Sequence, residues 1–161
     1  MTVREYNTAV DEYADALFRF VLKNINDRDA AKDIMQDVFE KVWLKRDGIE
    51  FEKVKSYLFT AAYRTMLDAI KKTKKHDAEP EKVAARLGYE SEEVDLSEVL
   101  ENALSRLPEQ QKAVIMLRDY EGYSYEEIGE ITGLSESQVK VYIYRGRMAL
   151  KNYLVDINLV L

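Results

Sequence analysis

The sequence predicts an all-α protein of two small helical domains joined by an acidic linker. Apolar residues recur at helical spacing through most of the chain, and no strand-like alternation of useful length interrupts them. Two helix-start signals also lie eleven residues apart near the C-terminus. The expected boundaries are 1–76 for the first domain, 77–96 for the linker and 97–161 for the second domain.

Three amphipathic helices are expected in the first domain. The first covers about residues 5–25 and ends before an Asn-Asp pair that can cap the next helix. The second covers about residues 28–46 and stops at an Asp-Gly pair. The third covers about residues 54–75 and contains neither glycine nor proline. The short connections between them predict a three-helix bundle.

An acidic segment separates the two predicted domains. Residues 77–101 hold nine acidic and two basic side chains together with Pro80 and Gly88, a composition typical of a solvated linker with at most a short helical turn. Positive charge gathers on either side of it. Residues 64–76 carry five lysines or arginines against one acid, and residues 140–151 carry four against none.

A helix-turn-helix is predicted in the second domain. A helix over about residues 97–105 leads to Pro108, which suits the first turn of the next helix, and that helix should end near Gly122. Ser-Tyr-Glu-Glu at 124–127 and Ser-Glu-Ser-Gln at 135–138 then both fit the capping box. Between them, Gly133 can end one helix through a left-handed turn before the last helix begins.

One face of the last helix is a candidate DNA-reading surface. Val139, Ile143, Gly146 and Leu150 share a narrow sector of the helical wheel and should face the core, with Gly146 allowing close helix packing. The opposite sector is polar and basic, as in helices that read base edges and contact phosphates. The candidate DNA-binding residues are Ser137, Gln138, Lys140, Val141, Tyr144, Arg145 and Lys151. The alternative for this face is an ordinary solvated helix surface.

Composition excludes several classes of function. The chain has no cysteine and a single histidine, His76, so no metal site, cofactor or thiol chemistry is expected. Its acidic residues come without a partner histidine or a glycine-rich phosphate loop, so no enzyme activity is expected. No apolar run approaches the length of a membrane span, which predicts a cytoplasmic protein without direct membrane insertion. A net charge of −6 argues against a protein that simply coats nucleic acid.

The segment LPEQQKAVIMLRDYEGYSYEEIGEITGLSESQVKVYIYRGRMALKNYL closely resembles region 4 of extracytoplasmic-function sigma factors of the sigma-70 family. DAAKDIMQDVFEKVW resembles their region 2.2, and VKSYLFTAAYRTMLDAIKK resembles their regions 2.3 and 2.4. The resemblance spans nearly the whole chain. It implies an alternative sigma factor that binds core RNA polymerase and directs promoter recognition and transcription initiation.

The resemblance also assigns residues to partners. Region 4 would read the minus-thirty-five element of promoter DNA through the last helix. The residues expected to bind core polymerase are Asp33, Gln36, Asp37 and Glu40. Those expected to hold the unpaired minus-ten strand are Tyr57, Tyr63, Arg64, Lys71 and Lys72, with ordinary packing as the alternative for the tyrosines.

Other classes of function remain open on the sequence alone. The resemblance also implies an anti-sigma factor as a further partner. A stand-alone helix-turn-helix regulator would instead use the first domain for dimerisation or ligand binding and would bind palindromic sites. A structural or interaction protein would show no dependence on DNA.

Overall fold

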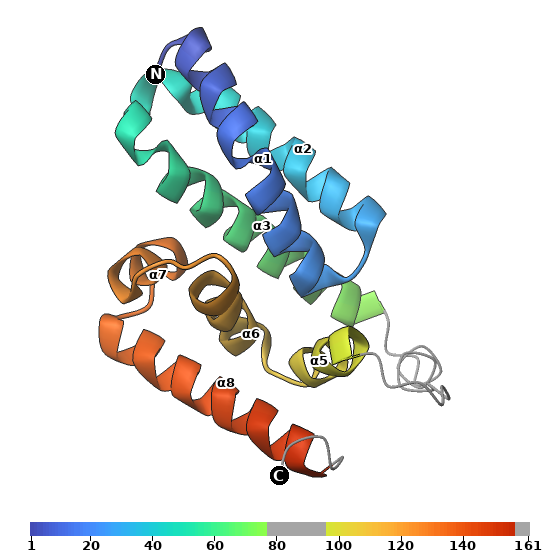
Figure 1. Ribbon diagram of the computed structural model, residues 1–161. Helices are drawn as coiled ribbons and strands as arrows, with labels where there is room; N and C mark the ends of the chain where they lie inside the picture. The colour runs from blue at the N-terminus through green and yellow to red at the C-terminus, as the bar shows by residue number, and fades with distance from the viewer. Residues whose placement is uncertain (77–95, 157–161) are drawn as a thin grey trace.

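Two groups of helices stack on each other in the computed structural model, which describes residues 1–76 and 96–156 (Figure 1). The N-terminal bundle comprises α1 (Val3–Ile25), α2 (Arg28–Lys45) and α3 (Val54–His76), with 3-10 turns at Arg46–Gly48 and Phe51–Lys53. The C-terminal unit comprises α5 (Leu96–Ser105), α6 (Glu109–Ile115), a π-helical segment (Met116–Tyr120), α7 (Tyr125–Thr132) and α8 (Glu136–Asp156). The described residues form helices and no strands, which confirms the all-α prediction.

Local capping signals define the helix ends of the N-terminal bundle. Thr2 and Glu5 form a capping box at the start of α1, and Asn26 ends that helix in the left-handed conformation with φ of 57°. Asp27 then caps α2 by accepting a hydrogen bond from the Ala30 amide at 3.1 Å. These caps satisfy backbone groups that the helix termini would otherwise leave unpaired. The bounds agree with the expected helices to within about two residues, the usual uncertainty of helix ends.

The C-terminal unit differs from expectation in two details. Pro108 precedes α6 as its N-cap, with ψ of 144°, and does not occupy the first helical turn. The helix that follows does not run regularly toward Gly122, because residues 116–120 widen into a π-helical segment.

The predicted linker and its helical turn fall on residues 77–95, outside the described part of the chain. Leu96, expected as the last linker residue, already belongs to α5.

The last helix packs closely against α6 through Gly146. A Cβ atom built on this residue would overlap the Cδ1 atom of Ile115 and would lie 3.2 Å from its Cγ1 atom. The glycine therefore allows a closer approach of the two helices than any other residue would, as the sequence predicts. Val139 and Ile143 are buried on the same side of α8, whereas Leu150 is half-buried.

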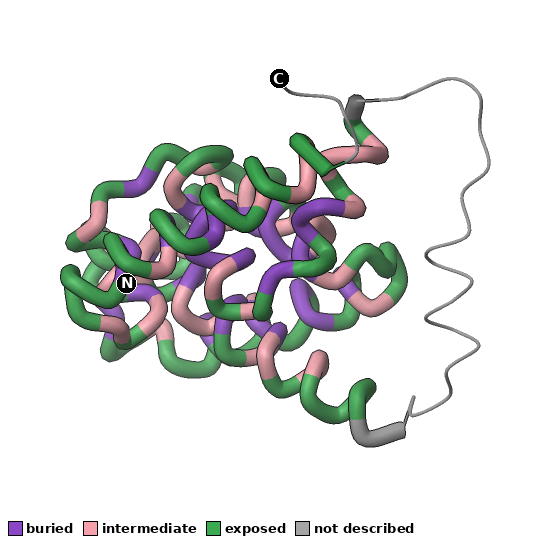
Figure 2. The backbone as a smooth tube through the Cα atoms, turned by 90° about the horizontal axis from the view of Figure 1, so that it is seen from below, coloured by how far each residue is buried: buried purple, intermediate pink, exposed green. Residues whose placement is uncertain are grey.

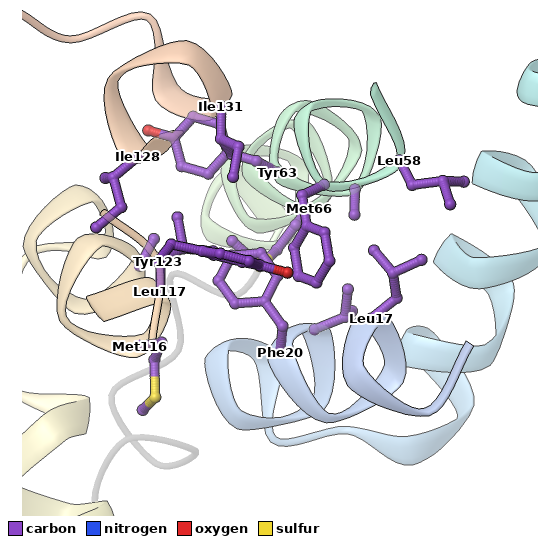
Figure 3. Packing of buried hydrophobic residues seen from close by; sticks show 14 of the residues in the cluster. Leu17, Phe20, Leu58, Tyr63, Met66, Met116, Leu117, Tyr123, Ile128 and Ile131 are labelled. Atoms are coloured by element: carbon purple, nitrogen blue, oxygen red, sulfur yellow. The ribbon is translucent and has the colours of Figure 1, made fainter. Parts of the chain in front are cut away.

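A shared apolar cluster joins the two groups of helices. Figure 3 shows Phe20 of α1 beside Tyr123 of the C-terminal unit, and Tyr63 of α3 beside Ile128 and Ile131 of α7. Phe59 contacts the rings of both Phe20 and Tyr123, with centroids 5.8 and 5.0 Å apart. Buried residues accordingly lie along the middle of the molecule, in both groups of helices (Figure 2). The sequence did not predict this packing between the groups.

Candidate nucleic-acid interface

The helix-turn-helix is held by reciprocal hydrogen bonds at both of its helix starts. Ser124 and Glu127 form the predicted capping box of α7. At the start of α8, the Ser135 amide donates to Gln138 Oε1 at 3.0 Å and the Gln138 amide donates to Ser135 Oγ at 3.2 Å. Gly133 ends α7 with φ of 78°, a conformation that favours glycine. These contacts confirm the predicted turn and fix the angle at which α8 leaves α7.

The outer face of α8 is exposed along its whole length, and its inner face packs against α6. All seven predicted DNA-reading residues are exposed: Ser137, Gln138, Lys140, Val141, Tyr144, Arg145 and Lys151. Tyr144 is 66% exposed, although tyrosine side chains in soluble proteins are usually partly buried. Because the opposite sector is buried, the helix can present only this face to a partner.

The two arginines that flank Gly146 have different surroundings. The Arg147 guanidinium donates two hydrogen bonds to the Asp119 carboxylate of the π-helical segment, and both side chains stay partly exposed to solvent. The hydrogen bonds from Arg147 to Asp119 raise the pKa of the guanidinium. Arg145 points away on the exposed face. Arg147 therefore orients α8, and Arg145 is the arginine available to phosphate.

Four of the five predicted minus-ten residues lie exposed on α3, namely Tyr57, Arg64, Lys71 and Lys72. The fifth, Tyr63, is only 3% exposed and packs near Ile128 and Ile131 of α7 (Figure 3). Burial raises the pKa of its hydroxyl. In this arrangement Tyr63 cannot stack on a base, because the C-terminal unit covers its ring. The burial of Tyr63 matches the alternative of ordinary packing in this arrangement, and its contact with the minus-ten strand stays a prediction.

A basic cavity of about 600 Å³ opens beside α3. Tyr57 and Arg64 line it together with Ser56, Thr60, Ala61 and Thr65 of the same helix. Lys41 and Lys45 of α2 and Lys53 of the second 3-10 turn add three cations that sequence reasoning missed. Among the residues that the structure describes, Glu130 of α7 is the acidic residue that lines it. Only the packing of α2 against α3 brings these lysines together, so helical periodicity alone could not assign them.

The predicted polymerase-binding residues form one exposed stripe on α2. Asp33, Gln36, Asp37 and Glu40 are all exposed, at spacings that place them along one side of the helix. Ile34, Met35 and Val38 on the other side are buried in the bundle. Three carboxylates on a rigid, outward-facing helix can bind a basic partner surface.

The fold and these surfaces define a class of protein, namely an all-α DNA-binding protein with one helix-turn-helix and a second basic surface on a separate helical bundle. Within residues 1–76 and 96–156, no helix is long and apolar enough to cross a membrane. No cluster of histidine and acidic side chains in the same residues could hold a metal ion.

Comparison with known proteins gives the particular family. Residues 9–76 match sigma-70 region 2, and residues 97–150 match sigma-70 region 4. The chain belongs to the sigma-70 family and is an alternative sigma factor of the extracytoplasmic-function type. The stand-alone regulator is not favoured by these matches.

Similar proteins include curated sigma factors and a solved complex. The ECF RNA polymerase sigma factor SigM of Bacillus subtilis is 26% identical over 144 residues, covering 86% of this chain and 88% of its own. The RNA polymerase sigma factor SigV of the same species is 29% identical over 139 residues, covering 86% and 84%. The sigma factor RpoE from Bartonella quintana, solved with the anti-sigma factor NepR, superimposes with a TM-score of 0.76 at 25% identity, covering 94% of this chain and 98% of that chain.

Proposed function

We propose that this sigma factor divides promoter recognition between the exposed face of α8 and the basic surface of α3. The observation that carries the proposal is the exposure of all seven candidate residues on α8 while its opposite sector is buried. The N-terminal part of such a helix fits the major groove and reads base edges. In this chain that part would read the minus-thirty-five element.

The surface around Tyr57 and Arg64 would hold the unpaired minus-ten strand. Single strands bind where cations follow the phosphates and aromatic rings stack on bases. Lys41, Lys45 and Lys53 supply further positive charge around the same cavity, and Tyr57 is 39% exposed there. Lys71 and Lys72 would extend this surface toward the end of α3.

The acidic stripe of α2 would dock on core RNA polymerase. Its position on the side of the bundle away from the buried core leaves it free for a large partner. We further propose a cytoplasmic location, a first domain at 1–76 and a second domain that begins at Leu96 with α5, and restraint by an anti-sigma factor. The last point is supported by the similar sigma factor whose structure contains NepR.

A run-off transcription assay tests the proposal as a whole. Purified core polymerase would be incubated with a genomic promoter pool, with and without the protein. Discrete transcripts that start only in its presence support sigma function, and their upstream sequences give the promoter. Protein dimers on palindromic DNA without redirected polymerase would replace this function with that of a stand-alone regulator.

Matched variants test the α8 and α2 surfaces separately. Tyr144→Ala should reduce use of the minus-thirty-five element by about tenfold, the loss expected for one good base contact, whereas Val155→Ala on the same helix should have no effect. Asp37→Lys should weaken binding to core polymerase, and Asp11→Lys makes the same charge change on exposed α1. Equal effects of Asp37→Lys and its control on polymerase binding would exclude the α2 stripe as the docking site.

A further inference from the structure

The basic cavity beside α3 has the size of a small-molecule site. Its volume is about 600 Å³, and pockets that hold small ligands and cofactors usually enclose about 300–1,000 Å³. Its lining residues come from α2, the second 3-10 turn and α3, apart from Glu130 of α7. The cavity is therefore mainly a feature of the N-terminal bundle.

The cations of this cavity are largely without acidic partners. Within residues 1–76 and 96–156, Lys41, Lys45 and Arg64 form no ion pair with a carboxylate. The fourth cation, Lys53, lies 3.6 Å from Glu50 in a pair that is well exposed to solvent, and such pairs are weak. Four like charges around one space repel one another. An anion with several charges would relieve this repulsion.

Hydroxyl groups and one aromatic ring complete the cavity wall. Ser56, Thr60 and Thr65 line it, and Lys41 Nζ lies 3.5 Å from Thr65 Oγ1. The ring of Tyr57 is 39% exposed at the same cavity. Cations that meet phosphates and a ring that stacks on a base are the two elements by which proteins hold nucleotides without reading their sequence. The cavity offers both within the space of one small ligand.

We propose that this cavity binds a free nucleotide that carries two or more phosphates. The lysines would contact its phosphates, and Tyr57 would stack on its base. This site goes beyond the proposed function, because its ligand is a small molecule and not a promoter strand. Tyr57 and Arg64 would serve both ligands, so nucleotide and strand would compete for α3, each weakening the other to the same extent.

A pair of charge variants tests the site. The probe is ATP that carries a methylanthraniloyl fluorophore on its ribose, and binding is followed by fluorescence anisotropy. Lys45→Gln should weaken binding about tenfold, the loss expected for one charge-assisted contact to phosphate. Lys32→Gln removes the same charge at an exposed residue of the same helix that does not line the cavity, and its effect should stay within about twofold. Equal effects of the two variants would overturn the proposal.

A second pair of variants tests the cavity at constant charge. Ser56→Leu adds bulk to the cavity wall and should weaken ATP binding at least about tenfold, because the side chain occupies space that the nucleotide needs. Thr73→Leu makes a similar change at an exposed residue of α3 outside the cavity and should leave binding unchanged. Circular dichroism checks that both variants are folded. Unchanged binding by folded Ser56→Leu would contradict a site inside the cavity.

Competition experiments identify the ligand class. Unlabelled ATP should displace the probe about tenfold more strongly than inorganic triphosphate does, because stacking on Tyr57 adds to the phosphate contacts. Equal displacement would refute a nucleotide site. An unlabelled DNA strand of randomised sequence should also displace the probe. If a fluorescein-labelled strand binds and the ATP probe does not, the nucleotide site is refuted and the proposed function of α3 stands. If the ATP probe binds and the strand does not, the nucleotide site stands and that function is refuted.

Discussion

Replacing Gly146 with alanine should have opposite effects on stability depending on residue 115. In the natural chain the added Cβ atom overlaps the Cδ1 atom of buried Ile115. Overpacking of this kind costs about 1–3 kcal/mol, and the gain in helix propensity from glycine to alanine offsets about 1 kcal/mol of it. Gly146→Ala should therefore lower the free energy of unfolding by up to about 2 kcal/mol.

Ile115→Val removes the Cδ1 atom and leaves Cγ1 at 3.2 Å from the new Cβ, a contact that a small shift can relieve. In this background Gly146→Ala should raise the free energy of unfolding by up to about 1 kcal/mol, because the propensity gain remains and the overlap is gone. Urea titrations followed by circular dichroism on both single variants and the double variant give the interaction energy. The same effect of Gly146→Ala in both backgrounds would refute this account of helix packing.

Three further predictions concern stability, pH and DNA binding. Burial lowers the pKa of Lys112 to about 8, although the nearby charges of Glu101 and Glu109 act to raise it. The folded chain therefore loses this proton at a lower pH than the unfolded chain does. The free energy of unfolding should rise by up to about 3 kcal/mol from pH 8 to pH 10.5 for this reason. Denaturant titrations of Lys112→Met should show a pH dependence without this rise. Ser124→Ala should lower the free energy of unfolding by about 1 kcal/mol, which thermal unfolding would detect. Ser124→Asn should keep most of the stability that Ser124→Ala loses, because asparagine also caps helices well. Arg147→Ala should lower stability by up to about 1 kcal/mol, whereas Arg145→Ala should weaken DNA binding, measured by anisotropy, at unchanged stability.

Sequence reasoning predicts the features that short-range chemistry determines. Both capping boxes and the left-handed Gly133 follow from residues within four positions of one another, so their hydrogen bonds can be expected without tertiary information. The close packing at Gly146 follows from helical periodicity. The exposed faces of α2 and α8 follow in the same way, because a helix with one apolar sector must direct the other sector to solvent.

Contacts between distant segments are beyond the reach of such reasoning. Arg19 and Glu121 form an ion pair although they are 102 positions apart, and nothing in either local sequence indicates the other. Tyr63 illustrates the consequence, since its place on a basic, aromatic helix favours an exposed ring while its actual partners come from α7. The basic cavity needs three separate segments to meet. The π-helical segment likewise has no local signal that we could identify.

The shared apolar cluster also bears on how the chain is made. Synthesis proceeds from the N-terminus, so the N-terminal bundle leaves the ribosome before α6 and α7 exist to cover it. Until then, the surface of α3 that carries Phe59 and Tyr63 has no partner from the C-terminal unit. Exposed apolar surface of this kind favours aggregation and chaperone binding. The nascent bundle should therefore be the stage at which production of this protein most depends on chaperones.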